Sequence, residues 1–287
     1  LLSSPQMLVP YRKMHGTGNI ILVLDRRAAA GPPPSPGELR ELGDSKRGPG
    51  FDQLMWIGKP CDDRSIARYR VFNRDGSEVE QCGNGVRCVA KYLAAELGDG
   101  STEQEFTLQS PAGPVDARVR IDGNVAVSMG TPRFDPADIP FEATAAASQY
   151  DLDVDGRSVS IAVVSMGNPH AVLEVGNVDE QPVARIGAAI ENHPRFPEKT
   201  NVGFMHIIDR DEIVLRVHER GVGETAACGT GACAAVVTGQ RQGRLDETVT
   251  VGLPGGEVVV SWRGGAAEVW LEGNAEVLNE GLLDLKE

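Results

Sequence analysis

Two stretches of this 287-residue sequence open in the same way: CGNGVRCVAKYLAAELG at residues 82–98 and CGTGACAAVVTGQRQG at residues 228–243. Each joins a cysteine and two glycines to an apolar run that ends at a further glycine, Gly98 or Gly243. Apolar residues at helical spacing followed by a glycine are typical of a helix and its C-terminal end. The sequence therefore predicts one strong helix directly after each Cys-Gly-x-Gly.

The two stretches close a longer series of paired landmarks. A Gly-Asn before an apolar run, an amide before a strand, an Arg-Val-x-polar motif and the cysteine recur in one order: Asn19 and Asn168, Gln53 and Asn201, Asn73 and Glu219, Cys82 and Cys228. The spacings within these pairs are 149, 148, 146 and 146 residues. Such a constant period indicates duplication of a unit of about 145 residues, an ordinary domain size. We predict an N-terminal domain of residues 7–127 plus 274–287, carrying Cys82, and a C-terminal domain of residues 128–273, carrying Cys228.

Outside the two helices the pattern favours strands. Short runs rich in Val, Ile and Phe fill residues 107–129 and 248–273, where Gly and Pro clusters mark turns, and the apolar run 20–24 has the length of a buried strand. The acidic, Pro-rich residues 130–155 are interpreted as a connector and an exposed loop. The expected fold class is α+β: two pseudo-symmetric domains, each a mixed β-sheet wrapped around a central helix.

Composition excludes several classes of partner. The chain carries 28 Lys plus Arg against 41 Asp plus Glu, a net charge of −13, which disfavours nucleic acid and anionic membranes. No apolar run approaches the roughly 20 residues that span a bilayer. The first residues, LLSSPQM, have neither the basic start nor the apolar stretch of a signal peptide, so we expect a lead-in outside the fold.

Cysteine usage points to the cytoplasm. Five cysteines are an odd number, which argues against a secreted disulfide framework and for reduced thiols. The spacings from Cys82 to Cys88 and from Cys228 to Cys233 are not those of a zinc clamp, so no metal is expected. For Cys61, Cys88 and Cys233 we expect small buried apolar side chains.

Cys82 and Cys228 have a context suited to chemistry. The positive end of a helix lowers the pKa of a thiol, and small glycines let an anion approach the N–H groups of the first turn. Two such helix starts would hold one carboxylate and place one sulfur on each face of the adjacent carbon. A thiolate removing the α-proton and a thiol returning one would invert the α-carbon of an amino acid.

At this point the sequence resembles a family. NRDGSEVEQCGNGVRC at residues 73–88 and ERGVGETAACGTGACAA at residues 219–235 closely resemble the two active-site signatures of diaminopimelate epimerases. KMHGTGN, FDQLM, GNPHAV and TNVGFM match the other landmarks of the family in order, so that the resemblance runs from Lys13 to the C-terminus. It implies an epimerase, independent of pyridoxal phosphate and of any other cofactor, that interconverts L,L- and meso-diaminopimelate for lysine and peptidoglycan precursors. The implied fold returns the extreme C-terminus to the first domain.

The resemblance also implies roles for individual residues. Cys82 and Cys228 are the acid/base pair, and the backbones of Gly83, Asn84, Gly229 and Thr230 hold the reacting carboxylate. The implied substrate contacts are Asn19, Gln53, Asn73, Asn168, Asn201 and Arg220; His170 supports the reacting centre, and Glu219 lies with the substrate-binding groups as a further support. The family's first motif continues Gly-Asn-Asp-Phe, whereas Asn19 is followed here by Ile20 and Ile21, so that looser positioning is expected beside Asn19.

Other interpretations remain open at this stage. A proline racemase-like enzyme or another one-ended amino acid epimerase would not need the cation of Arg220 for a second carboxylate. An amino-acid-binding protein would have no use for two thiols, and a thiol hydrolase would need one cysteine with a histidine base. Asn168 before Pro169 also fits an ordinary turn, His170 a packing histidine, and Arg220 an exposed ion pair with Glu219. We expect a small-molecule substrate, and the choice between monomer and homodimer stays open.

Overall fold

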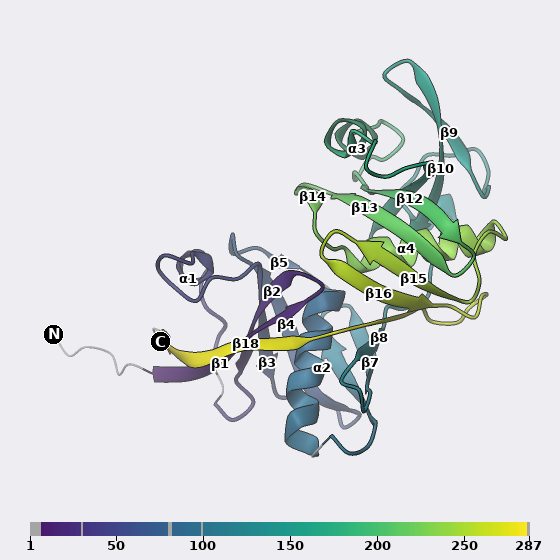
Figure 1. The fold of residues 1–287 in the computed structure, drawn as a ribbon. Helices are drawn as coiled ribbons and strands as arrows, with labels where there is room; N and C mark the ends of the chain where they lie inside the picture. The colour runs from purple at the N-terminus through teal and green to yellow at the C-terminus, as the bar shows by residue number, and fades with distance from the viewer. Residues whose placement is uncertain (1–6, 30, 80–81, 99, 286–287) are drawn as a thin grey trace. The chain divides into compact units, whose positions relative to one another are not determined.

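The computed structural model describes residues 7–29, 31–79, 82–98 and 100–285 (Figure 1). The N-terminal lead-in expected from the sequence lies, apart from Met7, outside these residues. The chain divides into two compact domains. The first takes the chain up to Val127 and the segment from Gly273 onward, and the second is Ser128–Glu272. Each combines a mixed sheet with helices, which confirms the predicted α+β class.

The sheet of the first domain is mixed because two of its neighbouring pairs are parallel. In spatial order its strands are β18 (Glu276–Leu285), β1 (Met7–Gly16), β2 (Asn19–Asp25), β3 (Gln53–Gly58), β4 (Ser65–Asn73), β6 (Gln104–Ser110), β7 (Gly113–Val119) and β8 (Val125–Ser128). The pairs β2–β3 and β4–β6 are parallel, and the short β5 (Glu78–Val79) pairs with the end of β4. The C-terminal strand β18 thus pairs with the N-terminal strand β1.

Helix α2 (Gly83–Leu97) forms the centre of the first domain. Its side chains Val86, Val89, Ala90 and Leu93 are buried, and it packs against strands β1, β2, β3 and β7 (Figure 1). Burial over most of a helix surface is typical of a helix enclosed by a sheet. The run 20–24 lies within the buried strand β2, as its length predicts.

The second domain repeats the same pairings. Its strands are β9 (Tyr150–Val154), β10 (Arg157–Ser165), β11 (Pro169–Glu174), β12 (Asn201–Asp209), β13 (Glu212–Glu219), β14 (Gly223–Thr225), β15 (Thr248–Leu253), β16 (Gly256–Ser261) and β17 (Trp270–Gly273). The pairs β11–β12 and β13–β15 are parallel, as β2–β3 and β4–β6 are in the first domain. Helix α4 (Gly229–Arg241) is almost entirely buried and takes the central place of α2.

Two expectations about the less regular segments were wrong. Residues 130–155 contain the 3₁₀ turn η1 (Pro136–Asp138) and strand β9, and they contribute Ile139 and Phe141 to the apolar core of the second domain. Only part of this segment is therefore a connector. Two shorter helices were also missed: α1 (Pro36–Gly43), which begins with a capping box between Ser35 and Glu38, and α3 (Val183–Glu191).

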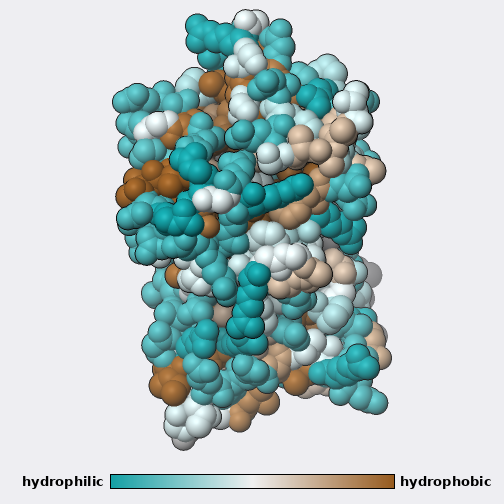
Figure 2. Space-filling model, turned by 90° about the vertical axis from the view of Figure 1, so that its right-hand side faces the viewer, coloured by the Kyte–Doolittle hydropathy of each residue, from teal (hydrophilic) through white to brown (hydrophobic). Residues whose placement is uncertain are grey.

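The surface agrees with the acidic composition. Figure 2 shows polar side chains over most of one face, with apolar ones in small groups. Among the described residues, no helix combines the length and the apolar character needed to cross a membrane.

Candidate active site

Cys82 is the N-cap residue of α2. Its backbone is extended, with φ −146° and ψ 104°, and the N–H of Gly85 donates to its Sγ atom at 3.3 Å. Gly85 is required for packing, because a Cβ atom there would lie 2.5 Å from Sδ of Met55. The sulfur therefore lies at the positive end of the buried helix, where a thiolate is stabilised.

Three predicted residues from different strands meet Cys82 in one chain of amides. Nδ2 of Asn19 lies 3.9 Å from Sγ of Cys82 and donates to Oε1 of Gln53 at 3.3 Å. Nε2 of Gln53 donates to Oδ1 of Asn73 at 3.0 Å, and Nδ2 of Asn73 donates to Oγ of Ser77 at 3.0 Å. The pairing of Gln53 opposite Asn73 in β3 and β4 sets this arrangement. Ser77 was not singled out from the sequence.

The chain beside Asn19 is held at two points in spite of the Ile20-Ile21 departure. The N–H of Ile20 donates to Oδ2 of Asp52 at 2.9 Å, and Ile21 is fully buried. Ile20 itself packs against the apolar cluster of the domain. These contacts hold the main chain beside Asn19, and the looser positioning expected there stays a prediction.

Cys228 is the N-cap residue of α4 and is buried. Its Sγ atom donates to Oε2 of Glu219 at 3.3 Å and lies 3.6 Å from Oγ1 of Thr230, while Oγ1 of Thr225 donates to Oε1 of Glu219 at 2.6 Å. Burial, and then the negative charge of Glu219, raise the pKa of the Cys228 thiol well above its usual value. The expected lowering of the thiol pKa by the helix start was therefore wrong at Cys228, which is protonated at neutral pH.

His170 and Asn168 lead to the same helix start. Nε2 of His170 donates to Oδ1 of Asn168 at 2.9 Å, and Nδ2 of Asn168 donates to Oγ1 of Thr230 at 3.4 Å. Burial, and to a smaller extent the charge of Arg220, lower the pKa of His170 to about 3. A neutral His170 thus orients the amide of Asn168 toward the first turn of α4.

Asn201 and Arg220 are joined through the main chain. Oδ1 of Asn201 accepts from the N–H of Arg220 at 3.0 Å, and its Nδ2 donates to the carbonyl of Pro169 at 3.0 Å. Nη1 of Arg220 donates to the carbonyl of Glu198 at 3.1 Å, so this guanidinium takes a carbonyl partner rather than forming the plain ion pair with Glu219. Asn201 is buried and supports the backbone here.

The remaining predicted residues are backbone groups. Gly83 and Asn84 form the first turn of α2, and Gly229 and Thr230 that of α4. The N–H groups in the first turn of a helix have no carbonyl partner within the helix, so they can receive a carboxylate. Thr225, which orients Glu219, was missed, since no spacing marks a threonine that serves a neighbouring strand.

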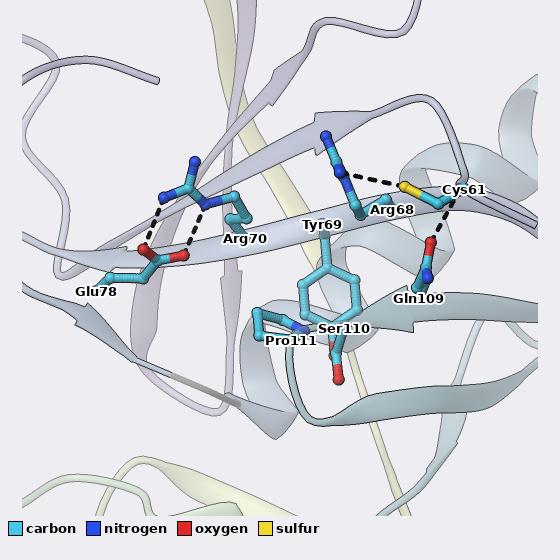
Figure 3. Close-up of a pocket in the computed structure, with 8 residues that line it drawn as sticks. All are labelled: Cys61, Arg68, Tyr69, Arg70, Glu78, Gln109, Ser110 and Pro111. Atoms are coloured by element: carbon cyan, nitrogen blue, oxygen red, sulfur yellow. Dashed lines mark hydrogen bonds and ion pairs between the residues drawn. The ribbon is translucent and has the colours of Figure 1, made fainter. Parts of the chain in front are cut away.

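The other three cysteines differ among themselves. Cys88 and Cys233 are fully buried, as predicted, and burial raises the pKa of Cys88 to about 12. The prediction for Cys61 was wrong, because this residue is exposed and accepts a hydrogen bond from Nη1 of Arg68 at 3.2 Å. It borders a cavity of about 430 Å³ that Tyr69 and the Arg70–Glu78 ion pair also line (Figure 3). None of the predicted site residues lines this cavity.

Comparisons with known proteins relate this chain to a family and to a fold. The chain is 47% identical over 279 residues to the diaminopimelate epimerase of Ectopseudomonas mendocina and 49% identical over 283 residues to that of Thioalkalivibrio sulfidiphilus, covering 97% of this chain and all of each relative. Among solved structures, a hydroxyproline epimerase from Agrobacterium vitis matches with a TM-score of 0.72 at 17% identity, covering 99% of this chain and 93% of that one. A PhzF-family phenazine biosynthesis protein from Bacillus anthracis matches with a TM-score of 0.67 at 15% identity, covering 97% and 100%. At these identities the two structures show the fold alone.

The family model described as diaminopimelate epimerase matches residues 11–134 and 162–278, which include all the predicted site residues. The resemblance seen in the sequence is thereby confirmed. The chain belongs to the diaminopimelate epimerase family.

Proposed function

We propose that this protein interconverts L,L- and meso-diaminopimelate by two proton transfers at one α-carbon. The observation that carries the reaction type is the duplicated half-site: in each domain a cysteine caps the N-terminus of the buried central helix. The near half identity to curated diaminopimelate epimerases over 97% of the chain supports the choice of substrate.

The protonation of the two thiols suits a two-base reaction. Cys228 holds its proton at neutral pH because it is buried beside Glu219, so it is the acid for the isomer whose α-hydrogen faces Cys82. A Cys82 thiolate removes the α-proton, and Cys228 donates its own proton to the other face of the carbon. The products are the inverted amino acid, a Cys82 thiol and a Cys228 thiolate. The reverse reaction uses the cysteines in exchanged roles.

The developing charge needs no electron sink apart from the protein. When the α-proton leaves, negative charge spreads onto the carboxylate, and the first-turn N–H groups of α2 and α4 are proposed to hold it. In this proposal Gly83, Asn84, Gly229 and Thr230 supply those donors, and no cofactor takes part. Preorganised donors at a helix start are suited to this role because they require no rearrangement during the reaction.

Arg220 is the proposed anchor of the distant carboxylate of diaminopimelate. A guanidinium binds a carboxylate through two parallel hydrogen bonds, and Arg220 now uses Nη1 on the exposed carbonyl of Glu198. The amides of Asn19, Gln53, Asn73, Asn168 and Asn201 are the proposed remaining contacts. A one-ended amino acid would leave Arg220 without a carboxylate, which is how substrates of that kind are disfavoured.

Further parts of the proposal concern the cell and the assembly. Reduced thiols are required for the reaction, so we propose a cytoplasmic enzyme that supplies lysine and peptidoglycan precursors. We also propose a homodimer through the outer face of β1 and β18, where Leu8 and Leu282 are 61% and 62% exposed. Among the described strands, β18 pairs with β1 along one of its edges, and its other edge has no partner strand. An unpaired strand edge beside exposed apolar side chains favours association with a second copy.

Incubation with L,L-diaminopimelate followed by chiral chromatography tests the function directly. The expected result is growth of the meso isomer to a constant ratio, with no added cofactor and no change after prolonged dialysis against a chelator. The same protein should leave L-proline and hydroxyproline unchanged. Turnover of these one-ended substrates with none of diaminopimelate would refute the proposal.

A further inference from the structure

Helix α3 departs twice from what a stable helix prefers. Gly187 lies in its middle, where glycine is unfavourable compared with alanine. Glu191 is its last residue and is 6% exposed, so that a carboxylate is buried at the negative end of the helix dipole. Locally unfavourable residues in a native protein often serve a site. The contacts of these two residues show which segment they serve.

The carboxylate of Glu191 reaches across to strand β13 and the turn after it. Oε2 accepts from Nε2 of His218 at 2.9 Å, Oε1 accepts from the N–H of Gly221 at 3.0 Å, and Nζ of Lys199 lies 3.7 Å from Oε1. Burial alone would raise the pKa of the Glu191 carboxyl, but the hydrogen bonds from His218 and Gly221 outweigh it and hold the pKa below its usual value. Glu191 is therefore an anion at neutral pH.

Gly187 makes room for the same contact. A Cβ atom at this position would lie 2.5 Å from both Cβ and Cγ of His218, closer than side-chain atoms approach one another. The absence of a side chain lets the His218 ring pack on α3 and direct Nε2 toward Glu191. Helix α3 packs against strands β12, β13 and β14 (Figure 1), so it is a firm support for this ring.

The two residues held by Glu191 flank two proposed site residues. Glu219 and Arg220 lie between His218 and Gly221 in the chain, and Asn201 fixes the N–H of Arg220 in between. Three anchors thus hold the chain from residue 218 to residue 221: the side chain of His218 and the N–H groups of Arg220 and Gly221. From this segment the Glu219 carboxylate reaches Sγ of Cys228.

We propose that Glu191 is a positioning residue that, through His218 and Gly221, places Glu219 beside Cys228 and aims Arg220 at the distant carboxylate of the substrate. This inference deepens the proposed function and rests on it. Glu191 acts through the side chain of His218 and the N–H of Gly221. Removing the Glu191 carboxylate should therefore change KM and kcat more than a packing variant that lowers stability by the same amount.

The first test compares Glu191→Ala with Ile190→Val. Ile190 is the neighbouring residue of α3 and is fully buried in the apolar core, so its variant loses stability through packing and leaves the carboxylate of Glu191 in place. For Glu191→Ala we expect KM for diaminopimelate to rise and kcat to fall, together costing roughly ten- to a hundredfold in kcat/KM, because small displacements of positioned groups have effects of that size. For Ile190→Val both constants should stay at wild-type values while Tm falls.

Two further variants keep the test decisive if Glu191→Ala does not fold. Glu191→Gln retains an acceptor for the Gly221 N–H, so its kcat/KM should lie between those of the wild type and the Ala variant. Gly187→Ala leaves Glu191 in place but displaces the His218 ring, and it should raise KM although alanine favours the helix. Wild-type kinetics in a folded Glu191→Ala variant, or in both of these variants, would overturn the inference.

Hydrogen exchange separates this inference from the proposed function. In the enzyme without substrate, the amide of Gly221 should exchange faster in Glu191→Ala than in the wild type, and Ile190→Val should not show this local effect. The measurement is mass spectrometry of peptides covering residues 217–223. Unchanged exchange in a folded Glu191→Ala variant would refute the anchor. A wild-type protein that fails to epimerise diaminopimelate would refute the proposed function instead. The exchange measurement would then still test whether Glu191 anchors Gly221.

Discussion

The Sγ atom of Cys228 lies 3.3 Å from Oε2 of Glu219, and the thiol is the donor. A carboxylate at this distance keeps the sulfur protonated, because a thiolate would face a like charge in a buried place. Removing the carboxylate charge while keeping its shape should therefore change the acidity of one cysteine.

Glu219→Gln should lower the pKa of Cys228 and reduce epimerase activity by about a hundredfold or more, the range expected when a proton transfer loses its support. Iodoacetamide alkylation of Cys228, followed by peptide mass spectrometry across pH, measures the first effect. The reaction should begin at lower pH than in the wild type. Glu224→Gln, which alters an exposed carboxylate paired with Arg216, is the matched control and should leave the Cys228 profile in place.

Deuterium incorporation tests the two-base reaction. In heavy water, early meso product formed from the L,L isomer should carry deuterium at the inverted carbon, while the remaining L,L substrate keeps its hydrogen, because one sulfur removes the proton and another supplies the new one. Cys82→Ala and Cys228→Ala should each abolish inversion, and Cys233→Ala, on the same helix as Cys228 but buried in the core, should not. Early product that retains the original hydrogen would contradict two separate bases.

Arg220→Lys should raise KM for diaminopimelate by at least about tenfold, because a single point charge replaces a planar pair of donors. The fold should be retained, as circular dichroism and Tm would show. Arg210→Lys is the control, since Arg210 pairs with Asp246 on the surface of the same domain. A near-normal KM in Arg220→Lys would remove Arg220 as the distal anchor and would favour one-ended substrates.

His170 should make the protein less stable in mild acid. Its pKa is about 3 in the fold and about 6.5 in an unfolded chain, so between these values the unfolded state binds a proton that the native state does not. The free energy of unfolding therefore falls as pH is lowered from about 6.5 toward about 3. Urea unfolding of wild type and His170→Asn at pH 7 and pH 5 measures this, and the difference between the two pH values should be smaller in the variant. NMR of the His170 ring should show no titration between pH 8 and 5.

The sequence alone predicts those parts of this protein that are repeated or periodic. The fixed spacing of the Cys-Gly-x-Gly pairs marks the duplication, and the glycines after each helical run mark α2 and α4 to within a few residues. The helices α1 and α3 are of eight and nine residues and carry no repeated motif. The capping box of Ser35 and Glu38 does mark the start of α1, but this signal was overlooked. The alternation of Leu152 and Val154 in β9 was hidden by the acidic residues around it.

The electrostatics of the site depend on tertiary structure and could not be obtained in this way. A cysteine at a helix start is expected to be acidic, yet Cys228 is not, because strand β13 brings Glu219 to it and the domain buries it. Cys61 differs in another way. Burial was expected because cysteines are usually buried, but Cys61 lies in an exposed loop beside Arg68. The role of Glu191 depends on a contact across 27 residues of sequence, for which no local pattern exists.

The pairing of β18 with β1 has a consequence for synthesis on the ribosome. Residues 276–285 supply the partner of β1 along nearly its whole length, from Leu285 opposite Met7 to Glu276 opposite His15. A nascent chain therefore carries β1 without this partner until residues 276–285 have been translated and have left the exit tunnel. The second domain, by contrast, has its complete sequence once Glu272 has emerged. The domain that is translated first is thus the last to be completed, and a chain that stops shortly after Glu272 should contain a folded second domain joined to an unfinished first one.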